Sequence, residues 1–189
     1  MSKLYFKYAP MEAGKSLDLL KTAHNFEKKG RKILLFKPSE DDRAGTKMIR
    51  SRIGSEREAF PLTRNFPNKI YEYAEAMRPD AILIDEAQFL SRETIEYAAR
   101  VVDELEISVF CYGLKNDFKN ELFEGSAALI VFADKLEEIR TICDKCDRKA
   151  LMNLRLCNGV PVREGDQIQI GDEEYISVCR RCYKEAFDQ

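Results

Sequence analysis

The segment Ala9–Ser16 reads APMEAGKS and decides the fold class of this chain. It follows the apolar stretch Lys3–Tyr8 and precedes a helical pattern, which is where a phosphate-binding loop lies between a strand and a helix. Backbone amides in such a loop surround phosphate oxygens, and the helix N-terminus adds its positive end. Lys15 would then reach the β and γ phosphates of a nucleotide, and the Ser16 hydroxyl would coordinate Mg²⁺.

Two positions of this loop depart from the usual pattern. Ala9 stands where the pattern has its first glycine, which is acceptable provided that the φ angle of Ala9 stays negative. Glu12 places a carboxylate in a loop that binds anions. The alternative interpretation is an ordinary strand–turn–helix corner, but the run Gly14-Lys15-Ser16 in this context favours a phosphate loop.

Short apolar runs alternate along the chain with longer segments of helical spacing, which is typical of βαβ units around a parallel sheet. Gly30 would end the first helix and Ser91 would begin the third. The polar stretch Ser39–Ser55 predicts a long surface loop. We predict strands at Lys3–Tyr8, Lys32–Lys37, Glu58–Leu62, Ala81–Asp85 and Ile107–Tyr112, and helices at Lys15–Lys29, Lys69–Met77 and Arg92–Leu105.

Two carboxylates follow the apolar run Ala81–Ile84, at the carboxyl end of a buried strand, where open α/β sheets bind ligands. Asp85 is suited to hold Mg²⁺ through its water shell, as in other phosphate-loop enzymes. Glu86 then remains to accept a proton from an attacking hydroxyl. A strand that ends in two acidic residues is also commonly a solvated turn, and it is the upstream phosphate loop that favours catalysis.

Two Cys-x-x-Cys pairs lie in the last quarter of the chain and match a tetrahedral Zn²⁺ site. A site closed by four thiolates leaves no position for substrate, so the metal would be structural. The alternative is a pair of redox dithiols, which lack a thioredoxin-like context here. We interpret Cys111 and Cys157 as packing residues. The predicted ligands are Cys143, Cys146, Cys179 and Cys182.

Composition narrows the function further. The chain has 189 residues and a formal net charge of −2, with no basic stripe, so we expect no nucleic-acid partner. No run approaches transmembrane length and no signal peptide is visible, so we expect a cytoplasmic protein without a membrane partner. The change of texture near Cys143 predicts two domains: a nucleotide-binding α/β domain at 1–140 and a zinc-binding subdomain, with short antiparallel strands, at 141–189.

These motifs closely resemble the thymidine kinases of the zinc-containing, tetrameric type found in bacteria and in animal cytosol. The resemblance implies a RecA-like parallel sheet that carries the phosphate loop, and a zinc-held subdomain whose lasso-like loop closes over the nucleoside. It also implies a nucleotide-salvage reaction for DNA synthesis, in which a homotetramer converts ATP and thymidine to ADP and thymidine 5'-monophosphate. The residues that carry it are Ala9–Ser16, Asp85–Leu90, Gly113-Leu114, Asp117-Phe118, Phe123, the cysteine pairs and Ile170–Tyr175.

The same resemblance assigns roles to residues, with Glu86 as the catalytic base. The backbone from about Ile168 to Tyr175 would bind the polar edge of thymine, while Arg43 and Arg52 would touch phosphates or order their loop. ATP with its Mg²⁺ would contact Ala9, Pro10, Met11, Glu12, Ala13, Gly14, Lys15, Ser16, Asp85 and Gln88. Thymidine would contact Met11, Phe89, Leu114, Phe118, Phe123, Ile170, Gly171 and Tyr175. The chain departs from the family pattern at Ala13, where serine is common, and at Phe123-Glu124-Gly125, where the pattern reads Phe-Gly.

Two other functions fit single motifs. The run DEAQ at 85–88 is similar to a helicase box, but a helicase needs a second RecA-like lobe that 189 residues cannot supply. A non-catalytic zinc-ribbon interaction module with a degenerate phosphate loop would account for Ala9. Phosphorylation of nucleosides would exclude this module, and DNA-dependent ATP hydrolysis would favour the helicase.

Overall fold

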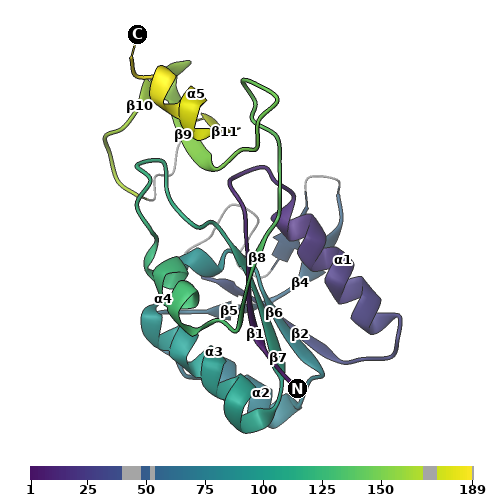
Figure 1. The fold of residues 1–189 in the computed structure, drawn as a ribbon. Helices are drawn as coiled ribbons and strands as arrows, with labels where there is room; N and C mark the ends of the chain where they lie inside the picture. Colours follow the sequence, from purple (N-terminus) through teal and green to yellow (C-terminus); the bar gives the residue numbers. More distant parts are fainter. Residues whose placement is uncertain (40–47, 52–53, 168–173, 189) are drawn as a thin grey trace.

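A computed structural model of the chain describes residues 1–39, 48–51, 54–167 and 174–188. Its centre is a six-stranded sheet in the order β5-β2-β6-β7-β1-β8, in which neighbouring strands are parallel (Figure 1). The predicted α/β class with a parallel sheet is therefore confirmed. The strands are β1 Leu4–Tyr8, β2 Ile33–Pro38, β5 Phe60–Leu62, β6 Ala81–Ile84, β7 Ser108–Gly113 and β8 Lys135–Glu138.

Helices cover both faces of this sheet, with α1 on one face and α2, α3 and α4 on the other (Figure 1). Successive strand residues point to opposite faces, so Leu34 and Ile82 join the core under α2–α4 whereas Leu35 and Leu83 join the core under α1. A strand buried on both sides must be apolar throughout, as β6 is. The helices are α1 Lys15–Glu27, α2 Lys69–Met77, α3 Arg92–Leu105 and α4 Glu124–Phe132.

Two of the predicted helices, α2 and α3, are confirmed to the residue. The Ser91 side chain accepts a hydrogen bond from the Thr94 amide, so it begins α3 as expected. The first helix ends at Glu27, two residues before the predicted end, and the chain turns through Gly30, whose φ is +71°. Within the described residues, no helix has both the length and the apolar character that crossing a bilayer requires.

The loop prediction for Ser39–Ser55 is wrong at its described end. Strands β3 (Met48–Arg50) and β4 (Glu56–Glu58) form an antiparallel pair, and the predicted strand at Glu58–Leu62 is divided between β4 and β5. Most of these residues are charged and exposed, so neither pattern is visible in the sequence. Ile49 alone anchors the pair, because its buried side chain packs in the core under α1.

Helix α4 and strand β8 were also not predicted. Helix α4 is apolar on nearly every side, so its sequence shows no helical periodicity. Strand β8 reads KLEE and lies at the edge of the sheet beside β1, where charged side chains remain in solvent.

The described residues from 141 onward include a separate antiparallel sheet, and we call this part of the chain the C-terminal module (Figure 1). Its strands are β9 (Met152–Cys157), β10 (Val160–Val162) and β11 (Glu174–Val178), followed by the short helix α5 (Arg180–Glu185). The predicted antiparallel strands are confirmed. Cys111 is buried as expected, but Cys157 is exposed at the end of β9, so its assignment as a packing residue is wrong.

Candidate active site

The loop Ala9–Ser16 connects β1 to α1, as its sequence context predicts. The amide of Ala9 donates to the Gly113 carbonyl at 3.3 Å, and Ala9 does not have a positive φ, so alanine fits where the pattern has glycine. Gly14 begins α1 with φ +78°, a left-handed conformation that favours glycine. Of Ala9 and Gly14, only Gly14 has the left-handed conformation that favours glycine.

The side chains of Lys15 and Ser16 are already held in place. The ammonium of Lys15 is buried and donates to the carbonyl of Pro10 at 2.8 Å. The hydroxyl of Ser16 donates to Asp85 Oδ2, also at 2.8 Å, although 69 positions separate the two residues. A hydroxyl beside a carboxylate is a pair of hard oxygen donors, which suits Mg²⁺.

Not every amide of the loop is available to phosphate. Pro10 has no N–H, and the amide of Met11 donates to Asn153 Oδ1 at 2.7 Å. The hydroxyl of Ser177 donates to the Met11 carbonyl. The amides that remain to bind phosphate are therefore those that follow Met11. Neither Asn153 nor Ser177 was predicted, since each is more than 140 positions from Met11 and belongs to no motif.

Asp85 lies at the end of β6, almost fully buried. Burial raises the pKa of this carboxyl to about 7, and the charge of Glu86 acts in the same direction, while the hydrogen bond from Ser16 opposes the shift. The backbone amide of Glu86 also donates to Asp85 Oδ1 at 3.0 Å. A cation bound beside Asp85 would favour its ionised form.

Glu86 is oriented by Gln88, which belongs to the short 3₁₀ helix η1 (Ala87–Phe89). Gln88 is 1% exposed, donates from Nε2 to Glu86 Oε2 at 2.5 Å, and accepts from the Leu114 amide at 3.0 Å. The amide group of Gln88 thus links the Glu86 carboxylate to the residue that follows β7, and the predicted contact of Gln88 with ATP stays a prediction.

Two glycines let η1 approach its neighbours. A Cβ added at Gly113 would lie 2.6 Å from Gln88 Oε1, and one added at Gly125 would lie 2.4 Å from the Ala87 carbonyl oxygen. Side chains cannot be accommodated at such distances without movement. Gly125 therefore lies in close contact with the backbone that directly follows Glu86.

The aromatic residues predicted around thymine form two pairs. The rings of Phe89 and Phe123 meet edge to face at 5.6 Å, and those of Phe118 and Tyr175 do so at 6.5 Å. Phe118 and Phe123 are buried, as is Leu114, while Phe89, Tyr175 and Met11 are half-buried. Ile170, Gly171, the backbone at 168–173, Arg43 and Arg52 lie outside the described residues.

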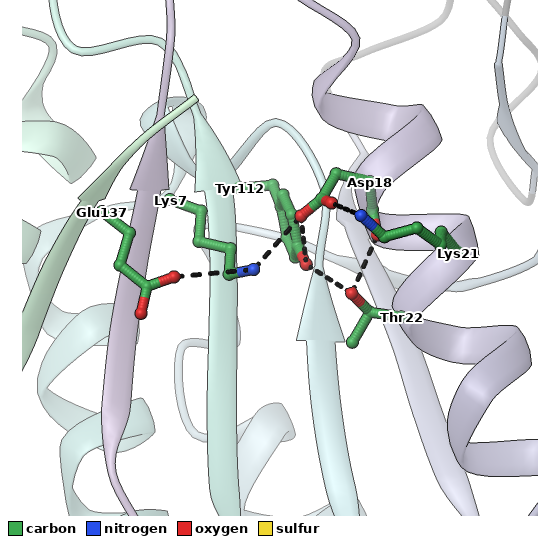
Figure 2. A network of polar contacts seen from close by, with 6 residues as sticks. All are labelled: Lys7, Asp18, Lys21, Thr22, Tyr112 and Glu137. Carbon is green, nitrogen blue, oxygen red and sulfur yellow. Dashed lines mark hydrogen bonds and ion pairs between the residues drawn. The ribbon is translucent and has the colours of Figure 1, made fainter. Parts of the chain in front are cut away.

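A polar network fixes α1 to the sheet just beyond the loop (Figure 2). Asp18 accepts from Lys7 at 3.1 Å and from Lys21, and the Tyr112 hydroxyl lies 3.3 Å from Asp18 and 3.1 Å from Thr22. Burial raises the pKa of Asp18, but the two lysines more than offset that effect, so its pKa lies below the ordinary value. The start of α1 is therefore tied to both β1 and β7.

The four predicted zinc ligands converge in the C-terminal module, with their sulfur atoms all within 4.8 Å of one another. Cys146 Sγ lies 3.7 Å from Cys179 Sγ and 3.6 Å from Cys182 Sγ. Four sulfurs around Zn²⁺ at about 2.3 Å would be about 3.8 Å apart, so the cluster has the size of a tetrahedral site. The separations are far too long for disulfide bonds. This cluster could hold one zinc ion.

Comparisons with known proteins show which proteins this chain is similar to. A family model described as thymidine kinase matches residues 2–183. A thymidine kinase of Lactococcus lactis subsp. lactis (strain IL1403) is 50% identical over 186 residues, and one of Streptococcus pyogenes serotype M3 (strain ATCC BAA-595 / MGAS315) is 48% identical over 184 residues. Both alignments cover 97% of each chain. Among solved structures, a DNA replication initiation factor matches with a TM-score of 0.40 at 15% identity, over 73% of this chain and 40% of that one.

Proposed function

This chain belongs to the thymidine kinase family and phosphorylates thymidine with ATP in nucleotide salvage, and we propose that Ala9–Ser16, Asp85 and Glu86 carry out the transfer. The observation that supports this assignment is the 2.8 Å contact between Ser16 and Asp85, which joins the phosphate loop to the acidic end of β6. The three proposed elements thus meet at one edge of the sheet, outside the carboxyl ends of its strands.

In the proposed reaction, the 5'-hydroxyl oxygen of thymidine attacks the γ-phosphorus of ATP. The bond from that phosphorus to the β–γ bridging oxygen breaks, and ADP leaves. Glu86 accepts the hydroxyl proton and later releases it to solvent. Gln88 supports this role because its hydrogen bonds to Glu86 and to the Leu114 amide hold the carboxylate in one orientation.

Phosphate charge is balanced by the loop in this proposal. Amides from Glu12 to Ser16 bind the phosphates, and Lys15 exchanges its contact with Pro10 for the β and γ phosphate oxygens. Ser16 and Asp85 are the residues that would hold Mg²⁺, directly or through water. A bound Mg²⁺ would neutralise charge that develops on the transferring group.

We propose that the base of thymidine lies among Met11, Leu114 and the two aromatic pairs. The pairs come from different segments, Phe89 with Phe123 and Phe118 with Tyr175, so they offer apolar walls from both domains. Ile170, Gly171 and the backbone near them remain proposed contacts for the polar edge of the base.

The cysteine cluster is the proposed site of a structural Zn²⁺, held by Cys143, Cys146, Cys179 and Cys182. We keep the division into a nucleotide-binding domain at 1–140 and a zinc-binding subdomain at 141–189, because each part has its own sheet and its own core. A homotetramer in the cytoplasm, without nucleic-acid or membrane partners, remains part of the proposal from the family resemblance.

The decisive experiment compares turnover of ATP with thymidine, deoxyuridine, deoxycytidine and deoxyguanosine, in wild type and in Lys15→Ala. The wild type should prefer thymidine over deoxycytidine and deoxyguanosine in kcat/KM, and Lys15→Ala should lose both ATP binding and turnover, because Lys15 meets phosphate in both states. ATP binding that survives unchanged in Lys15→Ala would disprove the proposed loop. ATP hydrolysis that depends on DNA would instead favour a nucleic-acid-dependent ATPase.

A further inference from the structure

The C-terminal module contacts the phosphate loop at Met11, and we propose that its Asn153 and Ser177 are positioning residues for ATP. This inference rests on the proposed role of Ala9–Ser16 as the ATP-binding loop. It assigns the module a task besides holding the nucleoside, since the zinc-bearing part of the chain would also set the affinity for the phosphate donor.

Both contacts are made to the backbone of Met11. Asn153 Oδ1 accepts from the Met11 amide at 2.7 Å, and the Ser177 hydroxyl donates to the Met11 carbonyl. Asn153 and Ser177 are cross-strand neighbours on β9 and β11, and each is 2% exposed. These bonds are costly to lose, because the buried side chains of Asn153 and Ser177 have little solvent to replace Met11 as a partner.

The position of Met11 explains why these contacts would matter to ATP. Met11 lies between Pro10, whose carbonyl holds the Lys15 ammonium, and the amides from Glu12 to Ser16. Bonds to its N–H and its C=O fix the peptide planes on both sides of the residue. The following amides are thereby held in direction before phosphate arrives, so binding does not have to order them.

Asn153 and Ser177 differ in what else they hold. Asn153 Nδ2 also donates to the Asn116 carbonyl at 2.8 Å, two residues after Leu114, so it touches both the ATP side and the proposed thymidine side. Besides Met11, Ser177 contacts Asp144 twice: its amide donates to Asp144 Oδ2 at 2.6 Å, and its carbonyl accepts from the Asp144 amide at 2.9 Å. Asp144 lies between Cys143 and Cys146 of the sulfur cluster. The structure thus predicts different phenotypes for the two residues.

The test uses the full chain with its metal, and measures dissociation constants for Mg²⁺–ATP and for thymidine separately, with zinc content and Tm. Ser177→Ala should raise the Kd for ATP about fivefold, the size expected for one lost hydrogen bond, and leave the Kd for thymidine within about twofold. Ser177→Thr keeps the hydroxyl and should restore ATP binding. Asn153→Ala should weaken both ligands. Asn158→Gly, in the β9–β10 turn, is the matched control and should change neither.

Three results would overturn the inference. One is a Kd for ATP within twofold of wild type in both Ser177→Ala and Asn153→Ala. Another is an equal loss of both ligands in Ser177→Ala together with a lower Tm, which would indicate general loosening of the module. A third is failure of Ser177→Thr to restore ATP binding in a folded, zinc-loaded protein. Lys15→Ala distinguishes failure of this inference from failure of the proposed function. If Lys15→Ala abolishes ATP binding while the Asn153 and Ser177 variants bind ATP as wild type does, the proposed function stands and only this inference fails.

Discussion

The parallel sheet and the C-terminal module hold their functional residues by different means. The sheet is covered on both faces, and residues such as Phe6, Ile82 and Leu83 are fully buried between strands and helices. The buried cluster of the module consists of Leu154, Leu156, Val178, Tyr183 and two of the four cysteines. A segment of about 50 residues rarely buries enough apolar surface to fold without a staple. The sheet should therefore be sensitive to packing, and the module to its metal.

Removal of one zinc ligand should have the largest effect, because it should unfold the C-terminal module while the parallel sheet stays folded. Cys146→Ser should unfold the module, because structural zinc contributes on the order of 10 kcal/mol of apparent folding free energy. Thymidine kinase activity should fall by about 10³-fold or more, since the module contributes Tyr175 to the proposed base site. Zinc analysis measures loss of the metal, and proteolysis detects unfolding of the module. Circular dichroism of the helices should show that the parallel sheet and its helices stay folded. Cys157→Ser, at an exposed cysteine outside the cluster, is the control. Full activity in a zinc-free protein would contradict the idea.

The next largest effect should come from chemistry at the sheet. Glu86→Gln should lower kcat by on the order of 10²-fold or more with little change in KM, because the base acts in the transition state while ground-state contacts remain. Glu93→Gln, an exposed glutamate in the first turn of α3, should keep wild-type rates. Steady-state kinetics for both substrates test this expectation. A kcat close to wild type would exclude Glu86 as the base and direct attention to Asp85.

Gly125→Ala should show how strictly packing controls the active site. Alanine favours a helix by up to about 1 kcal/mol over glycine, but its Cβ would lie 2.4 Å from the Ala87 oxygen and 2.8 Å from the Leu90 oxygen. These are backbone atoms that cannot rotate away, so overpacking of about 1–3 kcal/mol should win.

Urea unfolding of Gly125→Ala should therefore show a net loss of stability of about 1–2 kcal/mol. The value of kcat should fall by about tenfold, as a shift of η1 moves Glu86. Val131→Ala, exposed on the same helix, is the control. A variant that is as stable and as active as wild type would show that η1 can move without cost.

The sequence was sufficient where function depends on local order. Gly14, Lys15, Ser16 and Asp85 lie at strand ends and a helix start, and a parallel sheet brings such ends to one edge whatever the long-range details. The cysteine pairs were equally informative, because each pair already sets two ligands at metal spacing.

The sequence was not sufficient where a contact joins distant segments. Asn153 and Ser177 contact Met11 only once strands β9 and β11 lie against the phosphate loop, and no periodicity or motif in the sequence predicts that packing. The hydrogen bonds of Gln88 to Glu86 and to the Leu114 amide were not predicted either, since they depend on how closely η1 approaches β7. Helix α4 was missed because even the exposed positions near its end, Ile130 and Val131, are apolar, so no polar face gives the segment a helical period.

The smallest effect is expected for the polar network that ties α1 to the parallel sheet. If apolar packing holds the sheet, then removing one hydroxyl from the network in Figure 2 should cost little, even at the fully buried Tyr112. Tyr112→Phe loses contacts to Asp18 and Thr22, yet Asp18 keeps its two lysine partners. We expect a loss of about 1 kcal/mol, or a fall in Tm of about 3 °C, with the KM for ATP changed less than about twofold. Tyr71→Phe removes an exposed hydroxyl from Glu104 and should leave Tm unchanged. A tenfold rise in the KM for ATP in Tyr112→Phe would mean that this polar network, rather than packing, sets the position of α1 and of the loop before it.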